Sequence, residues 1–517
     1  MGAVKRTSFP LSEILAALSL ATDAGNGFPA EKTLRNTLLA MGIAGELGVD
    51  DRLRSDLYQA SLLRFIGCTA FTYELARLSG NEFTALQAFA PADDTKPGEA
   101  IHAMFAAGRG QGAAARARSL VANVTRGKAL GEFVVRADCE ANARFARRFG
   151  LGAGMVSILD DIYERWDGKG APRRLAGEDV APGARILALA HQAEIHHRNH
   201  GRDAAKEMAA QRSGGWFDPA CVSAFDRCAD RLFDLFERGS VWEEVLGAEP
   251  VPRVTVGASG LDDLAEGFAD FADLKSPTLL GHSRGVAALA AEAGRIAGLP
   301  GEDIATLRRA ALLHDLGRVA VPVAVWEKPG RLNDAEWEQV RLHAYHTERV
   351  LSRAPSLAAV AAVAGSHHER LDGSGYHRGA RAASLPLPAR ILAAADVYQA
   401  LTEQRPHRAA FPSGRAVEEL DREVAAGRLE QEAAAAVCAA TGGVLPKRAA
   451  SRPAGLTDRE VEILRLLARG RSKKEIAKEL VIAPGTVHTH VTHIYSKIGS
   501  STRAGAALFA VEQDLLR

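Results

Sequence analysis

Cysteine is scarce in this sequence of 517 residues. The five cysteines include no C-x-x-C pair and stand at Cys68, Cys139, Cys221, Cys228 and Cys438. Their odd number and scattered positions disfavour a disulfide framework and a thiolate zinc site, so we expect a reducing, cytoplasmic location. Long apolar runs are also missing, and Glu13 interrupts the apolar N-terminal stretch. We therefore expect no signal peptide, no membrane span and no membrane partner.

An excess of charge of either sign is absent as well. The chain has 64 Lys and Arg against 63 Asp and Glu, and 47% of its residues are hydrophobic. These values are average for soluble globular proteins and exclude a disordered or fibrous chain. Any surface that binds nucleic acid must therefore be local.

Strand-like alternation is nearly absent, whereas Ala, Leu, Arg and Glu recur at spacings of three and four residues. This period predicts an all-α protein. Two Gly- and Pro-rich stretches, 247–260 and 441–455, lack a helical apolar stripe and are interpreted as linkers. They divide the chain into predicted domains at 1–246, 261–440 and 456–517.

The first 440 residues contain an internal repeat. The pattern E-R-x-D-G-x-G begins at Glu164 and again at Glu369, an offset of 205, and A-R-I-L-A follows in both places. A second pair, SLLRFIGC at 61–68 and ALLHDLGR at 311–318, has an offset of 250. We interpret these matches as two copies of one helical domain, with an insertion or deletion between the two matched stretches.

A full set of potential metal ligands occurs in the second copy alone. Its members are His282, His314, Asp315, His343, His367, His368 and Asp396. The repeat places Lys32, Arg64, Phe65, Asp138, Ile162, Tyr163 and His191 opposite them. The first copy therefore cannot hold the same metal site.

The His-Asp pair at 314–315 can supply an imidazole and a bridging carboxylate to two neighbouring ions. Nitrogen and oxygen ligands without thiolate favour Fe or Mn over structural zinc. Two ions about 3.5 to 4 Å apart would support phosphoester hydrolysis. Arg318, four residues after His314, would share its helix face if the helix continues that far, and could hold a phosphate oxygen.

Four separated motifs, LLHDLGRVAVP, EKPGRLNDAEWEQVRLHAYHTERVL, HHERLDGSGYHRG and LPLPARILAAADVYQALTEQRPHR, resemble the HD-GYP branch of the HD phosphohydrolase superfamily. The resemblance covers residues 275–410. It implies an all-α metal centre that hydrolyses cyclic di-GMP or a related nucleotide. It makes the seven residues above metal ligands, with Asp315 bridging and catalytic, Arg318 catalytic, and a substrate loop at Gly373, Gly375 and Tyr376. Because Thr278 stands where some relatives have a third-metal glutamate, we expect two divalent ions, Fe or Mn.

Three positions depart from the family pattern. Arg318 replaces the lysine of HD-x-G-K, His377 replaces the proline of GYP, and Gly285 replaces an arginine of H-S-x-R-V. Two alternatives therefore stay open: a transcription factor whose HD domain only senses a ligand, or a hydrolase of another phosphoester. Gly373 and Gly375 could also serve only as turn residues, because the first copy keeps the equivalent glycines.

The first copy has histidines of its own. Of these, His196 and His200 stand at i, i+4 on one helix face, but no further ligand is evident. We interpret them as a solvated helix end or a dimer surface. By resemblance the first copy is a degenerate HD-GYP-like domain. His346 and His407 are expected to be surface or hydrogen-bonded core residues.

Positive charge is concentrated at the C-terminus, where residues 447–517 hold 13 Lys or Arg and 7 Asp or Glu. Three helices are predicted here: one capped by Thr457 with Glu460 as a capping box, one opened by Ser472, and one after Pro484-Gly485. The last two form a helix-turn-helix pattern, with Ile476, Ala477 and Val487 packing between them.

The motifs L-T-x-R-E, K-E-I-A, T-V-x-x-H-V and I-Y-x-K-I closely resemble the LuxR/NarL-type DNA-binding domain. The resemblance implies base or phosphate contacts by Thr486, His488, Thr489 and His493, and phosphate contacts by Lys473, Lys474 and Lys497. Such domains read two half-sites, so we expect a homodimer on DNA. The whole chain is predicted to be a cytoplasmic DNA-binding regulator with a binuclear-metal phosphodiesterase domain.

Overall fold

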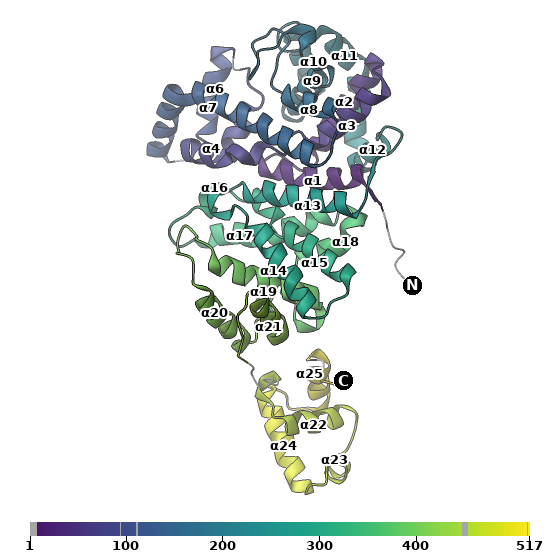
Figure 1. The fold of residues 1–517 in the computed structure, drawn as a ribbon, viewed down its shortest axis with the longest axis vertical. Helices are drawn as coiled ribbons and strands as arrows, with labels where there is room; N and C mark the ends of the chain where they lie inside the picture. Colours follow the sequence, from purple (N-terminus) through teal and green to yellow (C-terminus); the bar gives the residue numbers. More distant parts are fainter. Residues whose placement is uncertain (1–7, 94, 110–111, 447–452, 514, 517) are drawn as a thin grey trace.

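The computed structural model describes residues 8–93, 95–109, 112–446, 453–513 and 515–516. The predicted all-α class is confirmed (Figure 1). In the described part, the only named strands are β1 (Phe9–Pro10) and β2 (Thr255–Val256), which pair antiparallel with Phe9 opposite Val256. None of the helices found there has an apolar stretch long enough to cross a bilayer.

The helices fall into three groups along the chain. The first half contains α1 (Leu11–Gly25), α2 (Lys32–Leu47), α3 (Asp51–Leu63), α4 (Thr72–Ser79), α5 (Glu82–Phe89), α6 (Pro97–Ala107), α7 (Ala113–Arg148), α8 (Ala153–Asp160), α9 (Pro182–His200), α10 (Arg202–Gln211), α11 (Pro219–Arg238) and α12 (Val241–Gly247). The second half contains α13 (Ala258–Asp273), α14 (His282–Ile296), α15 (Gly301–Leu313), α16 (Val323–Trp326), α17 (Asp334–Leu351), α18 (Ala358–Ala364), α19 (Leu387–Thr402), α20 (Ser413–Ala425) and α21 (Gln431–Ala440). The C-terminal unit contains α22 (Asp458–Ala468), α23 (Lys473–Glu479), α24 (Pro484–Lys497) and α25 (Arg503–Glu512).

The two halves use equivalent contacts to anchor equivalent helices. At the start of α2, the Thr33 amide donates to Asp23 (3.1 Å), and at the start of α14 the Ser283 amide donates to Asp273 (3.0 Å). Glu164 accepts backbone amides nine and eleven residues later, and Glu369 does the same. These pairs have the same offsets, 250 and 205, as the sequence repeat.

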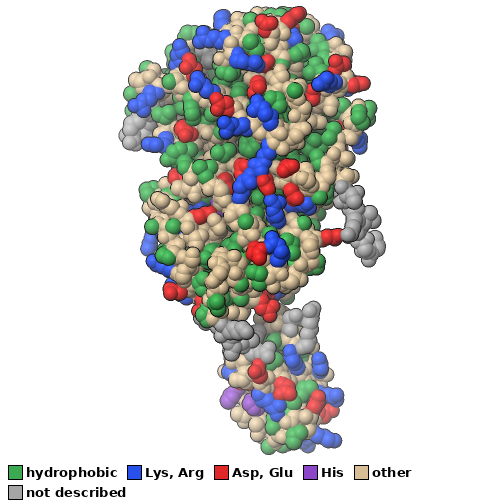
Figure 2. Space-filling model, viewed as in Figure 1, with side chains coloured by type: hydrophobic (Ala, Val, Ile, Leu, Met, Phe, Trp, Pro, Cys, Tyr) green, Lys and Arg blue, Asp and Glu red, His purple; other side chains and the backbone are tan. Residues whose placement is uncertain are grey.

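One hydrophobic cluster runs continuously from Leu11 to Leu445 and so includes both halves. At the junction, Arg148 on α7 contacts Asp270 on α13 at 2.6 Å, and Figure 2 shows charged side chains of both signs gathered there. Strand β2 and the start of α13 lie within 247–260, the first predicted linker. The division into domains stays a prediction.

The C-terminal unit has a separate core that includes Ile476, Ala477 and Val487, as predicted. The capping boxes of Thr457 and Ser472 are both present. The third helix begins at Pro484, and a fourth helix, α25, was not predicted. Part of the second predicted linker, residues 447–452, lies outside the described residues.

Candidate metal centre and nucleic-acid interface

The His-Asp pair lies where α15 gives way to a short 3-10 helix, η4 (Leu316–Ala320). Helix α15 does not continue to Arg318, so the condition for a shared helix face with His314 is not met, because the chain turns against α17 at Gly317. A Cβ at Gly317 would lie 2.0 Å from the His343 carbonyl oxygen. The Thr347 hydroxyl accepts from the Gly317 amide and donates to the His314 carbonyl, both at 2.8 Å.

The seven predicted ligands converge from α14, α15, α17, α19 and the turn after α18. Two groups have ligand atoms within 4.8 Å of one another: His282, His314 and Asp315, and His343, His367 and His368.

Asp315 belongs to the first group and also faces the second. Its Oδ2 is 3.4 Å from Nε2 of His282 and 3.1 Å from Nε2 of His314. Its Oδ1 is 3.4 Å from Nε2 of His343 and 3.6 Å from Nε2 of His367. One carboxylate therefore faces both groups, which is the geometry of a bridging ligand.

Asp396 faces the same two groups from α19. Its Oδ1 is 3.3 Å from Nε2 of His282, and its Oδ2 is 3.7 Å from Nδ1 of His368. The other ring nitrogens contact fixed acceptors: Nδ1 of His282 is 2.8 Å from Glu403, and Nδ1 of His314 is 2.7 Å from the Ala311 carbonyl. These contacts aim the Nε2 atoms of both histidines into the cluster.

The donor atoms of this cluster fit divalent cations. Nε2 of His282 and of His314 are buried and have no hydrogen-bond partner among the described residues. The same holds for both oxygens of Asp315, although that carboxylate is ion-paired with Arg318. Buried lone pairs without partners are costly, so their convergence points to bound cations. These nitrogen and oxygen donors suit such ions.

The electrostatics of the cluster favour ionised carboxylates. Burial would raise the pKa of Asp315 and of Asp396, but the cationic groups around them outweigh it and hold both pKa values well below the usual range. Burial lowers the pKa of His367 to about 4, and burial also holds the pKa of His368 well below its usual range. Burial also opposes charging of His282, yet the carboxylates around it raise its pKa to about 10.

The predicted substrate loop lies beside the cluster, with the Tyr376 ring 4.7 Å from the His368 ring. Gly373 has a φ of 82°, and a Cβ at Gly375 would lie 2.4 Å from the Arg370 amide nitrogen. Gly168 and Gly170 in the first half meet the same constraints. Turn geometry therefore accounts for the glycines, and a substrate role for them stays a prediction.

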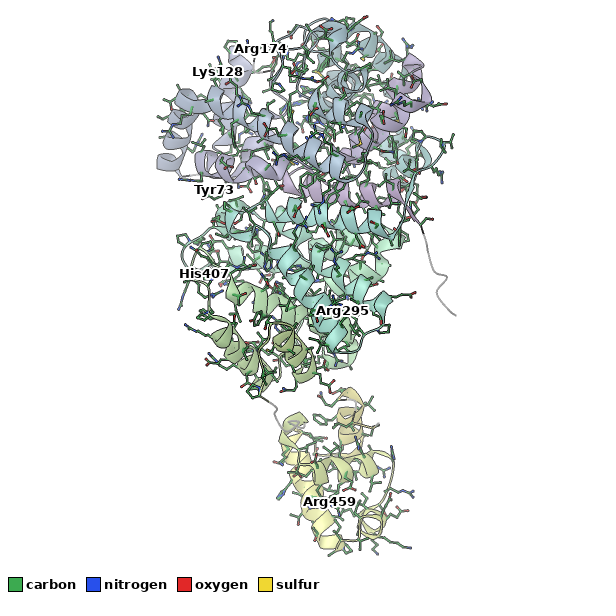
Figure 3. All side chains as sticks on the ribbon, viewed as in Figure 1. Tyr73, Lys128, Arg174, Arg295, His407 and Arg459 are labelled. Atoms are coloured by element: carbon green, nitrogen blue, oxygen red, sulfur yellow. The ribbon has the colours of Figure 1, made fainter. Side chains whose placement is uncertain are left out.

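The departures from the family pattern have visible environments. Nε2 of His377 lies 3.2 Å from Glu348 on α17, while a Cβ at Gly285 would meet the Gln399 side chain at 2.5 Å. His407 is exposed at the edge of the second half, as Figure 3 shows. Glu403 and Trp326 were not predicted. Glu403 follows Asp396 by seven residues, so helical spacing could have indicated it.

The equivalent place in the first half contains cations of the chain itself. Lys32 is fully buried, with Nζ 2.9 Å from Nδ1 of His191, and Arg64 is buried beside the Tyr163 ring. The Tyr163 hydroxyl donates to Asp138 at 2.8 Å. The rings of His196 and His200 are 6.3 Å apart, and neither belongs to a potential metal-binding group in the described residues.

The predicted DNA-contacting residues are exposed on α23 and α24 and comprise Lys473, Lys474, Thr486, His488, Thr489, His493 and Lys497. Nζ of Lys473 lies 2.8 Å from Nδ1 of His488, which joins the two helices of the turn. Nζ of Lys497 instead donates to Glu460 (2.6 Å) and to the Gly455 carbonyl (3.0 Å). The ammonium group of Lys497 is thus engaged within its own unit.

An all-α fold with histidines and aspartates gathered around an adjacent His-Asp pair defines a protein of the HD class. Residues 151–221 and 266–432 match the family described as HD domain, and residues 454–510 match the luxR family of bacterial regulatory proteins. The chain therefore contains an HD domain and a C-terminal domain of the luxR family, and it is homologous to HD-GYP phosphodiesterases.

Among curated proteins, the 3′3′-cGAMP-specific phosphodiesterase 3 of Vibrio cholerae is 29% identical over 418 residues, which cover 80% of this chain and 91% of that protein. The cyclic di-GMP phosphodiesterase response regulator RpfG of Xanthomonas campestris is 40% identical over 116 residues, 22% of this chain and 31% of that protein. A crystal structure of a cyclic GMP-AMP-specific phosphodiesterase of Vibrio cholerae aligns with a TM-score of 0.60 and 26% identity, covering 84% of this chain and 98% of that chain.

Proposed function

We propose that this chain is a transcriptional regulator whose second half binds two divalent ions, Fe or Mn, and hydrolyses a 3′3′-linked cyclic dinucleotide. The observation that carries the proposal is the position of Asp315, whose two oxygens face two separate histidine groups at 3.1 to 3.6 Å. Two ions held there would supply a hydroxide near neutral pH and polarise the phosphate. The relative that spans most of this chain makes 3′3′-cGAMP the first substrate to test.

The residues of the chain have separate tasks in this reaction. The guanidinium of Arg318 lies against Asp315 and is placed to hold a non-bridging phosphate oxygen. Glu403 fixes the ring of His282, so that its Nε2 points at the centre. Tyr376 forms a wall beside His368 against which a base can pack.

The C-terminal unit supplies the output. We infer that α24 enters the major groove of DNA, since its exposed residues include Thr486, His488, Thr489 and His493. Lys473 and Lys474 contact phosphates, and a homodimer reads two half-sites. Because Lys497 is held by Glu460, we assign it a stabilising role in its own unit.

The test is hydrolysis of 3′3′-cGAMP and of cyclic di-GMP by anaerobically purified protein. We expect turnover that the His314→Ala/Asp315→Ala variant lacks while it keeps a folded, helical chain. Matched substitutions at Arg64 and Phe65, the equivalent positions of the first half, should leave turnover in place. Metal binding without turnover of either nucleotide would support instead a sensor domain, the alternative that the HDLGR and GYH motifs favour.

A further inference from the structure

The guanidinium of Arg318 is held from two sides. Its Nε lies 2.8 Å from Oδ2 of Asp315, and its Cζ lies 4.9 Å from the centre of the Trp326 ring. The indole Nε1 of Trp326 also donates to the Arg318 carbonyl oxygen at 3.1 Å. Trp326 therefore fixes both the backbone and the charged group of this arginine.

This contact suits an arginine at position 318, where the family pattern has a lysine. A planar guanidinium stacks on an indole face, whereas a lysine ammonium is a compact, strongly hydrated charge on a flexible stem. The position of the Arg318 guanidinium therefore depends on the position of the Trp326 indole.

Trp326 is the last residue of α16, and the first half of the chain holds the other end of that helix. The amide of Val323, the first residue of α16, donates to Oε1 of Glu82 at 2.9 Å. The same oxygen lies 2.8 Å from Nζ of Lys275, and neither the Glu82 nor the Lys275 side chain is exposed. Removing an ion pair from water is costly, and further hydrogen bonds to the buried charges reduce that cost. The hydrogen bond from the first residue of α16 therefore helps to stabilise the buried pair.

Glu82 belongs to a stretch that is longer in the first half than in the second. The stretch from Arg64 to Asp138 is 45 residues longer than the equivalent stretch from His314 to His343. Helix α5, which begins at Glu82, lies within this longer stretch. The half without the full ligand set therefore contributes a carboxylate that contacts the other half next to its candidate metal centre.

We propose that Glu82 is a positioning residue for the reaction in the second half: through Val323, α16 and Trp326 it holds the guanidinium of Arg318 beside Asp315. This inference rests on the proposed function for its catalytic consequence, whereas the structural link from Glu82 to Arg318 does not depend on it. It gives the first half a defined task, which is to set the geometry of an arginine in the site of the second half.

Hydrogen–deuterium exchange on the full-length, metal-loaded protein tests the link. The double substitution Glu82→Leu/Lys275→Met removes the acceptor of α16 and leaves no unpaired buried charge. We expect amide exchange in 316–326 to rise about 10-fold, as for the loss of one hydrogen bond, with exchange in α17 unchanged. The control is Glu13→Gln, which alters another contact between the halves, that of Glu13 with Ser356. Unchanged exchange in 316–326 would overturn the proposal.

Kinetics with 3′3′-cGAMP test the consequence. We expect Trp326→Leu to lower kcat/KM about 10-fold at unchanged metal content. Trp326→Phe should keep most of the parent kcat/KM. The control, Trp337→Leu at an exposed position of α17, should leave kcat/KM unchanged. In an Arg318→Lys background Trp326→Leu should cost less than about twofold, because contacting residues are not additive. Equal losses in both backgrounds would refute action through Arg318. If the unsubstituted protein has no activity, the proposed function is refuted. The exchange measurement would still test the structural link from Glu82 to Arg318.

Discussion

At the residue scale, the two halves place different residues around their buried carboxylates. The second half brings together five histidines and two aspartates, whereas the first half places Lys32 and Arg64 at the equivalent positions. In the first half, side-chain cations reduce the cost of burying carboxylates. In the second half, metal ions would do so. A buried acid of the first half whose pKa stays raised despite these cations should therefore be a measurable burden on stability.

Asp138 is that acid. Burial raises its pKa to about 6, although Tyr163 donates to it. Between about pH 4 and 6, the folded chain therefore binds more protons than the unfolded chain. The contribution of Asp138 to stability is present below about pH 4 and is lost as the pH rises to about 6. We expect Asp138→Asn to remove that loss, about 3 kcal/mol. Thermal unfolding from pH 4 to 8 measures it, with exposed Asp263→Asn as control; parallel pH curves for parent and variant would contradict this prediction.

Glu403 provides a second prediction at this scale. Because Glu403 holds Nδ1 of His282, Glu403→Ala frees the imidazole to rotate, and we expect metal affinity to fall about 10- to 100-fold. Residual metal per chain after dialysis against graded chelator measures this effect. The exposed Glu418 on α20, replaced by alanine, is the matched control. Equal retention in both variants would show that Glu403 does not orient the ligand.

At the element scale, helix ends position the chemistry. The turn after α15 requires Gly317, and α16 presents Trp326 to Arg318. In the C-terminal unit, capping boxes begin α22 and α23, and a core separate from that of residues 11–445 holds the helices together. Helix caps and core packing in this unit should therefore affect its stability without affecting the metal centre.

Thr457→Ala tests this independence. Loss of the N-cap of α22 should cost about 1 kcal/mol. We expect calorimetry of the full chain to show a lower Tm for the C-terminal transition alone, with cyclic dinucleotide hydrolysis unchanged. Residues 11–445 share one hydrophobic core and should give one transition. A shift of both transitions would contradict the independence of the two cores.

At the scale of the whole molecule, the sequence predicted the all-α class and the helix-turn-helix from local helical periodicity and capping patterns. It predicted the seven converging residues from the internal repeat and from the resemblance to the HD-GYP family. It did not predict that α15 ends before Arg318, because that turn depends on the close approach of α17 at His343. Nor did it predict Glu82 or Trp326, whose partners lie in other elements. Contacts between the halves have no periodic signature in sequence.

The central claim is that one half of the chain holds a binuclear centre and the other half holds none. Metal analysis of the anaerobically purified protein tests it most directly. The account predicts about two Fe or Mn per chain, all lost in His314→Ala/Asp315→Ala and all retained when Lys32 and Arg64 are replaced. Four ions per chain, or two that survive the loss of His314 and Asp315, would contradict it.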